Sequence, residues 1–312
     1  MTLQQLRDFI AIADIGSLRG AASSRGVTGP ALAKSVRLLE EELHVALLER
    51  RSRGMVLTED GMALLAHARL IDSQSRKAIE DLAQRRGKQE GSLVLGVGPS
   101  AGVALMPGVL KDFQRKYPAV QIDMFGGSYY DHIGPILQGS IDLAIVAVPE
   151  TRESNLDAEH LFYNDLAVIC RRGHPLSGAR SLAELVDCVW ILTGPAGRGP
   201  GSAILEAFKQ LGLPAPTRLL QCDMTWTLNN LLVKSDMLCA LPRIMIEQPA
   251  LSGALQALHI VESLPHYSIS LLKRGDAPLL PIADYMATLI RRHAHYLGED
   301  SRRSAQPPLA AP

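Results

Sequence analysis

The sequence predicts an all-α domain at the N-terminus, one long helix after it, and an α/β module that fills the rest of the chain. Three observations predict this organisation. Apolar residues recur at helical spacing through residues 2–58, one helical pattern covers residues 59–86, and strand and helix patterns alternate over residues 92–297. A chain of 312 residues has room for two or three domains.

Composition and charge narrow the functional classes. Apolar residues make up 47% of the chain and charged residues 21%, which is typical of a folded globular protein and excludes a mainly disordered one. The 32 Lys and Arg residues balance the 32 Asp and Glu residues, so nucleic-acid binding would require a local basic patch. Aromatic residues are only 4% of the chain, which argues against a platform that stacks single-stranded bases.

The cysteines and the chain start point to a reduced, cytoplasmic protein. Cys170, Cys188, Cys222 and Cys239 are widely spaced and form no CxxC pair, so we expect neither a structural metal site nor a cofactor. Polar residues interrupt the apolar ones at the N-terminus, which does not resemble a signal peptide. No window holds 18 consecutive apolar residues, so no membrane span is predicted.

The first 58 residues are predicted to form short helices. Gly16 breaks the first helix, and Ser17 and Thr28 are suitable N-caps for the second and third. Such an arrangement suits helix-turn-helix DNA binding, in which the start of the third helix meets base edges and a basic loop contacts phosphates. The candidate DNA-binding residues are Ser17, Thr28, Gly29, Pro30, Lys34, Arg37, Arg50, Arg51 and Arg53. A three-helix bundle with a solvated charged face is the alternative.

The long helix carries a weak heptad seam. Its positions follow 4-3-4-3-4 spacing and are Leu64, Ala68, Ile71, Ser75, Ala78 and Leu82. A helix between two domains has little surface of its own chain to cover such a seam, so we expect it to pair two subunits. Packing on its own chain is the alternative. Residues 87–91 then read as a hinge.

The remaining chain alternates strands and helices with short connections, which predicts parallel sheets covered by helices. The expected strands are 93–97, 120–125, 141–148, 166–170, 189–192, 219–222 and 238–241. Residues 298–312 are expected to be a disordered tail.

Two loops of this module carry chemistry. Gly98–Gly102 follows a strand and matches the G-x-S-x-G elbow of serine hydrolases, although spacing singles out no histidine as the base. Residues 193–201 form a glycine-rich loop before a helix, an arrangement that binds anions, and Arg198 would add a charge-assisted contact. Thr225 and Trp226 follow another strand, where Trp226 would either stack on an aromatic ligand or pack in the core.

Residues 16–61 resemble the N-terminal signature of the LysR-type transcriptional regulators. Residues 137–145 also match that family's pattern at the end of its first effector half. The matching signature positions are Gly16, Ser17, Ala21, Ala22, Val27, Thr28, Pro30, Ala31, Leu32, Val36, Leu39, Glu40, Leu43, Leu47, Arg50, Arg53, Leu57, Thr58 and Gly61. A weaker resemblance, in residues 198–201, is to the branch that includes regulators of aromatic sulfonate breakdown.

The resemblance implies the fold and the domain limits. It implies a winged helix-turn-helix domain over 1–58, a dimerising linker helix and hinge over 59–90, and an effector module over 91–297. That module would have a periplasmic-binding-protein-like fold, with subdomain I at 91–164 plus 267–297 and subdomain II at 165–266. Residues 298–312 would follow as the tail.

The resemblance also implies the function, which is to bind duplex DNA as a dimer of dimers and to respond to a small effector. The loop chemistry favours an anion, such as an aromatic carboxylate or sulfonate. The expected effector-binding residues are Pro99, Ser100, Ala101, Thr193, Arg198, Gly199, Thr225 and Trp226. A hydrolase that uses Ser100 and a cytoplasmic small-molecule binding protein are the alternatives, and we expect no catalytic residues.

Four positions, among them Gly26, depart from the family pattern. Gly29 stands where the family usually has Gln, and Ala33 where it usually has Ser; both positions typically meet DNA. Arg25 stands where an apolar residue usually packs. The base preference of relatives therefore cannot be transferred to this chain.

Overall fold

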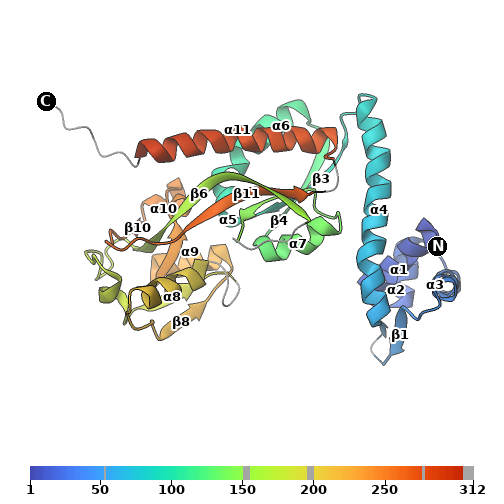
Figure 1. Ribbon diagram of the computed structural model, residues 1–312, viewed down its shortest axis with the longest axis horizontal. Helices are drawn as coiled ribbons and strands as arrows, with labels where there is room; N and C mark the ends of the chain where they lie inside the picture. Colours follow the sequence, from blue (N-terminus) through green and yellow to red (C-terminus); the bar gives the residue numbers. More distant parts are fainter. Residues whose placement is uncertain (53, 150–154, 195–199, 276–277, 305–312) are drawn as a thin grey trace.

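The computed structural model describes residues 1–52, 54–149, 155–194, 200–275 and 278–304 (Figure 1). Helix α4 (Glu59–Arg85) stands between a small helical domain and a larger α/β part. Among the described helices, none is long and apolar enough to cross a membrane.

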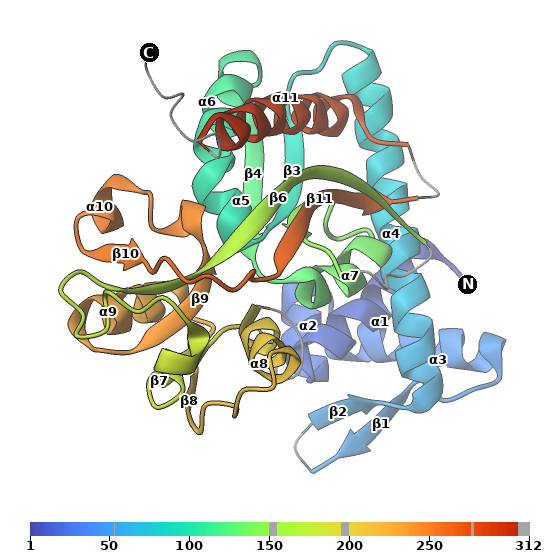
Figure 2. The same cartoon turned by 60° about the vertical axis from the view of Figure 1, so that its left-hand side comes forward.

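The N-terminal domain contains three helices and a hairpin. They are α1 (Leu3–Ile15), α2 (Leu18–Arg25), α3 (Gly29–Leu43), β1 (Leu48–Arg51) and β2 (Gly54–Leu57). The helices enclose a core in which Leu6, Phe9, Leu32 and Leu39 are fully buried. Figure 2 shows the hairpin projecting below the three helices. The residue pattern alone indicated only a basic loop here, because most residues of β1 are exposed and show no apolar alternation. The family resemblance implied the wing, and the hairpin occupies its place.

Two glycines allow the hairpin to approach the helices. Gly54 has a φ of 134°, and a Cβ atom there would lie 2.4 Å from the carbonyl oxygen of Gly16. Gly61 lies in the first turn of α4, where a Cβ atom would lie 2.1 Å from the carbonyl oxygen of Leu47. A larger residue at either position would push the hairpin away from the domain.

Arg25, which departs from the family pattern, pairs with a buried carboxylate. The Arg25 Nε atom lies 3.1 Å from Asp8 Oδ1, and only 3% of Asp8 is exposed. The Ser35 hydroxyl and the Gln4 amide also donate hydrogen bonds to Asp8, at 2.7 and 2.9 Å. The cation therefore compensates an acid that would otherwise be costly to bury.

Helix α4 closely matches the helix predicted over residues 59–86. The Thr58 hydroxyl caps it by accepting a hydrogen bond from Gly61 N at 2.9 Å. The predicted seam is divided, because Leu64 and Ala68 pack into the N-terminal core while Ile71, Ala78 and Leu82 stay exposed. Only the later half of the seam is therefore open to a second chain.

The α/β part is organised by a sheet of nine strands in the order β4-β3-β5-β11-β6-β9-β7-β8, with β10 paired to β6. Parallel pairs lie toward both ends of the sheet, and β11 and β6 pair antiparallel with each other in the middle. The strands are β3 (Gly91–Val97), β4 (Val120–Gly126), β5 (Leu143–Ala147), β6 (Leu156–Arg171), β7 (Val189–Leu192), β8 (Arg218–Gln221), β9 (Leu238–Pro242), β10 (Leu255–Ala257) and β11 (His266–Arg274).

Helices cover the two halves of this sheet (Figures 1 and 2). They are α5 (Pro99–Ala104), α6 (Met106–Lys116), α7 (Tyr129–Leu137), α8 (Pro200–Gln210), α9 (Thr225–Lys234), α10 (Pro249–Ser252) and α11 (Pro281–Ser304), with 3-10 turns η1 (Leu182–Leu185) and η2 (Arg243–Met245). The sequence of β5 is a continuous apolar run because both faces of this strand are buried. Leu143 and Ile145 pack in one core while Ala144 and Val146 pack in another on the opposite face.

The two central strands were only partly predicted. Strand β6 has 16 residues, but the sequence indicated a strand only at 166–170, where buried side chains are consecutive. The first half of β6 mixes buried and exposed residues. Strand β11, which the residue pattern did not indicate, has four consecutive buried residues, Ile269–Leu272, interrupted in apolar character by Ser270. These two strands join the two halves of the sheet, so the fold depends on the segments with the weakest sequence signal.

The prediction of a disordered tail over residues 298–312 is wrong for its first part. Helix α11 continues to Ser304, and residues 305–312 lie outside the described residues. The segment 298–304 contains no proline, and its one glycine, Gly298, weakens a helix that has already formed without ending it. The prolines that forbid helix come later, at Pro307 and Pro308.

Replacing Arg25 by Leu should destabilise the N-terminal domain. The carboxylate of Asp8 would stay buried without its cation, and we expect a loss of about 2–3 kcal/mol, less than for a fully buried pair because Arg25 is partly exposed. Urea unfolding followed by far-UV circular dichroism measures the loss. Asp8→Leu/Arg25→Leu removes both charges and should return stability to within about 1 kcal/mol of the wild type. A double variant as unstable as Arg25→Leu would contradict this assignment.

The contact between α6 and α11 should make the protein sensitive to acid. The His293 ring lies 2.9 Å from Asp112 Oδ2, and this hydrogen bond, helped by Arg292 and Arg115, holds the pKa of Asp112 below its ordinary value of 3.8. A lowered folded-state pKa stabilises the fold at pH above 3.8, and the stabilisation is lost as the pH falls through the folded-state value. Asp112→Asn should therefore lower the Tm at pH 7, and the difference from wild type should shrink toward pH 3. A difference that does not depend on pH would refute this.

Candidate nucleic-acid interface and ligand site

Helix α3 presents a charged and partly bare face to solvent. The Thr28 hydroxyl caps it by accepting a hydrogen bond from Ala31 N at 3.4 Å, and Pro30 lies in its first turn. The opposite face is buried against α1 and α2, which leaves Lys34 and Arg37 exposed. Arg37 pairs with Glu41 at 2.8 Å but its side chain remains 76% exposed. Both cations are therefore accessible to a polyanion.

A groove of about 980 Å³ lies between α3 and the hairpin. It brings together six of the predicted residues from three separate elements, namely Ser17, Gly29, Pro30, Arg37, Arg50 and Arg51. Thr28 and Lys34 are exposed outside this lining, and Arg53 lies outside the described residues. Ser17 caps α2 by accepting a hydrogen bond from Gly20 N at 3.1 Å, which orients the start of that helix toward the groove.

Arg19 is a further basic residue in this groove that the sequence analysis missed. It is exposed, in the first turn of α2, and it lines the same groove as the hairpin arginines. Its position two residues after the Ser17 cap was the signal that could have identified it. Arginines that come from three elements and line one concave surface suit contacts to the phosphates of a DNA duplex.

The first turns of α3 lack long polar side chains at two positions. Gly29 has no side chain, and a Cβ atom placed there would meet nothing within 4 Å. Ala33 is half-buried and lines the groove with only a methyl group. Space for larger side chains is therefore present at Gly29 but unused, which restricts hydrogen bonding to bases from this part of the helix.

The predicted ligand residues of subdomain I lie at the end of β3. Pro99, Ser100 and Ala101 begin α5, which has only six residues and packs against η2 of the other half of the sheet. Ser100 is 8% exposed and Ala101 is 1% exposed. Because Pro99 lacks an N–H and Gly102 N already bonds Gly98 O, the amides of Ser100 and Ala101 are the donors of this turn.

The predicted residues of subdomain II lie at the ends of β7 and β8. Thr193 follows β7, and Arg198 and Gly199 lie outside the described residues. The two strand ends are bound together, because Asp223 accepts a hydrogen bond from Gly194 N at 2.5 Å. Thr225 begins α9, and the Trp226 indole is 82% exposed. The core-packing reading of Trp226 is therefore wrong.

Several exposed side chains that the sequence analysis did not select lie near these strand ends. Met124 and Phe125 end β4 with 49% and 56% exposure, and Met224 precedes α9 with 66% exposure. On the central strands, the Tyr163 ring lies 4.3 Å from the His160 ring and 5.1 Å from the His266 ring, between centroids. Apolar and aromatic surface is thus available on both halves of the sheet and on the strands that join them.

The geometry around Ser100 does not resemble a hydrolase site. His160 bonds the Ser268 hydroxyl at 2.8 Å, and His174 is buried and bonds the Asp236 carbonyl at 3.1 Å. No hydrogen bond recorded between described residues joins Ser100 to a histidine. Burial also raises the pKa of the Cys170, Cys188 and Cys239 thiols, which makes them poor nucleophiles. Within the described ranges, no cluster of three or more acidic, His or Cys side chains could hold a metal ion.

Two family models match the chain. Residues 3–62 match the bacterial regulatory helix-turn-helix proteins of the lysR family, and residues 86–295 match the LysR substrate binding domain. The SDS degradation transcriptional activation protein of a Pseudomonas species is 29% identical over 313 residues, which cover 99% of each chain. The GbpR transcriptional regulator of Azospirillum brasilense is 28% identical over 287 residues, 90% of this chain and 83% of its own.

Solved structures share the fold. Full-length OxyR from Pseudomonas aeruginosa superposes with a TM-score of 0.70 at 23% identity, covering 93% of this chain and 95% of its own. The LysR family regulator CbnR gives a TM-score of 0.69 at 23% identity, covering 94% and 99%. These full-length neighbours confirm the predicted fold class, and none of the matches described here supports a serine hydrolase.

Proposed function

The chain belongs to the LysR family of bacterial transcriptional regulators, and we propose that its operator is held between α3 and the β1–β2 hairpin. The groove that collects Arg19, Arg37, Arg50 and Arg51 from three elements is the observation that carries this proposal. Helix α3 would enter the major groove and the hairpin would contact the backbone beside it. Arg53, at the tip of the hairpin sequence, would add a further phosphate contact.

The residues proposed to contact DNA have different roles. Lys34 and Arg37 are the exposed cations of α3, while Thr28 and Ser17 orient helix starts toward the DNA. Gly29, Pro30 and Ala33 offer backbone and apolar contacts, which favour thymine methyl groups and DNA shape over bidentate hydrogen bonds. Because Gly29 has no side chain, the operator of this protein would differ from the operators of relatives that have a longer side chain at that position.

Two chains would pair through α4. Ile71, Ala78, Ile79 and Leu82 are exposed there, and Ile79 is 68% and Leu82 57% exposed. Pairing these residues with a second copy would bury them and set two α3 helices on one pseudo-palindromic site. A dimer of dimers would then engage two neighbouring sites on the DNA.

The effector would bind between subdomain I and subdomain II. Ser100, with Pro99 and Ala101, would face Thr193 and Trp226 across the boundary, and Thr225, Arg198 and Gly199 would complete the site. The name of the Pseudomonas relative, an activator of SDS degradation, together with the exposed Met224, Trp226 and Phe125, favours an organic sulfate or sulfonate with an apolar body. Amides and an arginine would meet the anion and the apolar surface would meet the chain.

The wider organisation follows from this function. We propose domain limits of 1–58 for the DNA-binding domain, 59–90 for linker and hinge, and 91–297 for the effector module, with subdomain II at 165–266. A protein that binds chromosomal DNA acts in the bacterial cytoplasm. In this proposal Ser100 contacts the effector and has no catalytic role.

Replacing both α3 cations should weaken DNA binding. Lys34→Ala/Arg37→Ala should raise the Kd for the DNA upstream of the chain's own gene roughly 10- to 100-fold and flatten the dependence on salt, since fewer counterions are released. Gel shifts at two salt concentrations measure both effects. Arg115→Ala/Lys209→Ala removes the same charge from exposed positions of the effector module and should bind like wild type. If both double variants lose the same DNA affinity, the loss comes from the change in net charge and not from the α3 surface.

Hexyl sulfate should bind the effector module and hexanol should not. At a concentration of about 100 times its Kd, a ligand stabilises the native state by about 2.7 kcal/mol, which raises the Tm by several degrees. Differential scanning calorimetry of the full chain measures this shift. Trp226→Ala should reduce the shift, because the exposed indole would lose its apolar contact. If hexanol stabilises as strongly as hexyl sulfate, the anion has no role and the proposed effector class is wrong.

A further inference from the structure

One face of the linker helix is bonded to the effector module of its own chain. The Ser73 hydroxyl is buried and donates to the carbonyl of Gly139 at 2.6 Å. One turn further along, Lys77 Nζ lies 2.6 Å from Asp142 Oδ1. Near the end of α4, the Gln84 side chain accepts a hydrogen bond from Ile282 N at 3.2 Å, at the start of α11. These contacts repeat along more than two turns of α4, so they form a continuous joint.

Asp142 connects this joint to the strand that leads to the effector loop. Its Oδ2 atom accepts a hydrogen bond from Val94 N at 2.8 Å, and its own N–H donates to Val94 O at 2.9 Å. Val94 lies in β3, which ends at Val97 just before Pro99 and Ser100. One carboxylate therefore binds α4 with one oxygen and β3 with the other.

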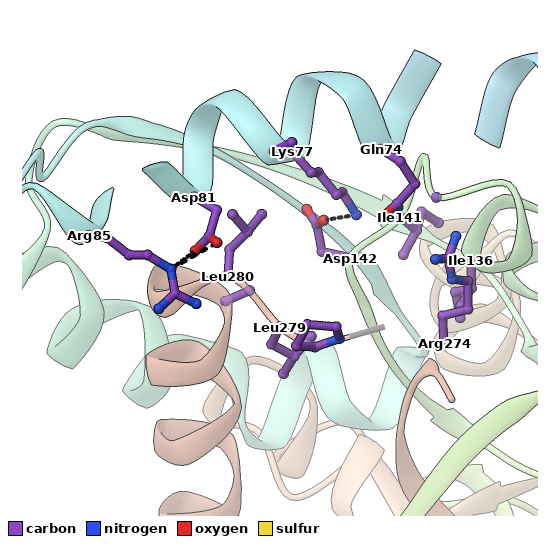
Figure 3. A pocket seen from close by; sticks show the side chains of 14 residues that line it. Gln74, Lys77, Asp81, Arg85, Ile136, Ile141, Asp142, Arg274, Leu279 and Leu280 are labelled. Carbon is purple, nitrogen blue, oxygen red and sulfur yellow. Dashed lines mark hydrogen bonds and ion pairs between the residues drawn. The ribbon is translucent and has the colours of Figure 1, made fainter. Parts of the chain in front are cut away.

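The joint is largely closed to solvent. The side chain of Asp142 is 10% exposed and that of Lys77 is 27% exposed. Figure 3 shows the pair at the edge of a cavity of about 170 Å³, which α4 lines together with Ile141, Leu279 and Leu280. Partial burial, and then the charge of Asp142, raises the pKa of the nearby Glu80 carboxyl. An ion pair in such surroundings is screened far less than a surface pair.

The same face of α4 also reaches the DNA-binding domain. The Arg69 guanidinium donates to the Gln138 side chain at 3.2 Å and pairs with Asp14 of α1. Arg7 of α1 pairs with Asp72 at 2.6 Å on the next turn. Helix α4 is thus bonded both to α1 and to the turn before β5.

The covalent link alone would not hold this arrangement. Residues 86–90 connect α4 to β3. Gly87 in this link and Gly91, the first residue of β3, have φ values of 90° and 154°. Glycine-flanked links permit many orientations. The orientation of subdomain I relative to α4 is therefore determined by the side-chain contacts of the joint.

We propose that Asp142 is a positioning residue that, through Lys77 on one side and Val94 on the other, holds subdomain I as one rigid body with the linker helix. Subdomain II is then the part that moves when an effector binds, and its displacement reaches α4 through β3 and Asp142. The second statement rests on the proposed function, whereas the rigid joint does not.

Hydrogen–deuterium exchange of the full-length protein tests the joint without any effector. Lys77→Met removes the cation, and Asp142→Asn removes the charge but keeps an oxygen that can accept from Val94 N. In either variant we expect the amides of residues 138–143 and 73–85 to exchange about tenfold faster, while α3 and β7–β9 keep wild-type rates. The double variant should be no faster than Lys77→Met, and Lys77→Arg should restore slow exchange.

The matched control is Arg85→Met, which removes a cation of the same helix that pairs with Asp81, one turn earlier on α4, at 2.9 Å. It should leave exchange at 138–143 unchanged. Unchanged exchange in Lys77→Met, or acceleration that extends to α3 and β7–β9, would overturn the proposal, because the pair would then be either unimportant or merely a contribution to global stability.

A second readout uses DNA. On the fragment upstream of the gene, Lys77→Met should bind within about threefold of wild type but change the bend angle in a circular-permutation gel, since the effector modules no longer follow α4 rigidly. An unchanged bend angle, despite faster exchange at the joint, would overturn the role of Asp142 in transmission. Failure of wild type to bind any operator would instead contradict the DNA-reading proposal and leave the exchange result standing.

Discussion

The architecture depends on one helix that must pack against two domains at once. Helix α4 buries Ala68 in the N-terminal core and Ser73 against the turn at Gly139, only five residues later. Residues on both faces must therefore be small or paired, which leaves only a narrow apolar stripe for another chain. This constraint explains Ala68 in the heptad seam, because a larger side chain at that position, as in a free coiled coil, would not fit the N-terminal core.

The DNA-binding surface is built by close backbone approach. Gly54 and Gly61 admit carbonyl groups at distances that no side chain would tolerate, and so the hairpin lies near α3 and forms one concave groove with it. The buried Asp8 and its partner Arg25 form an ion pair within the same domain. An unusual residue at position 25 is thus accommodated by a charge on α1, and the helices keep their arrangement.

In the effector module, the residues that form the core are different from the exposed residues that are available to a ligand. Both faces of β5 are buried, and the aromatic and apolar side chains that remain exposed gather at strand ends and on the central strands. Because two antiparallel strands join the halves of the sheet, relative motion of the halves would require bending at β6 and β11 and not loss of either core. A switch of this kind suits a protein that must transmit occupancy of a ligand site over a long distance.

By itself, the sequence determined the family, the three N-terminal helices, the long helix and most parallel strands, because buried periodicity and capping residues are local signals. Ser17, Thr28 and Thr58 cap helices in the structure. Only the tertiary structure decided the bounds of the hairpin strands, the length of β6, the exposure of Trp226, and the partners of Arg25 and Asp142. Those features join residues far apart in the chain, as with Lys77 and Asp142 or Asp8 and Arg25, and no local pattern encodes which distant charge a side chain will meet.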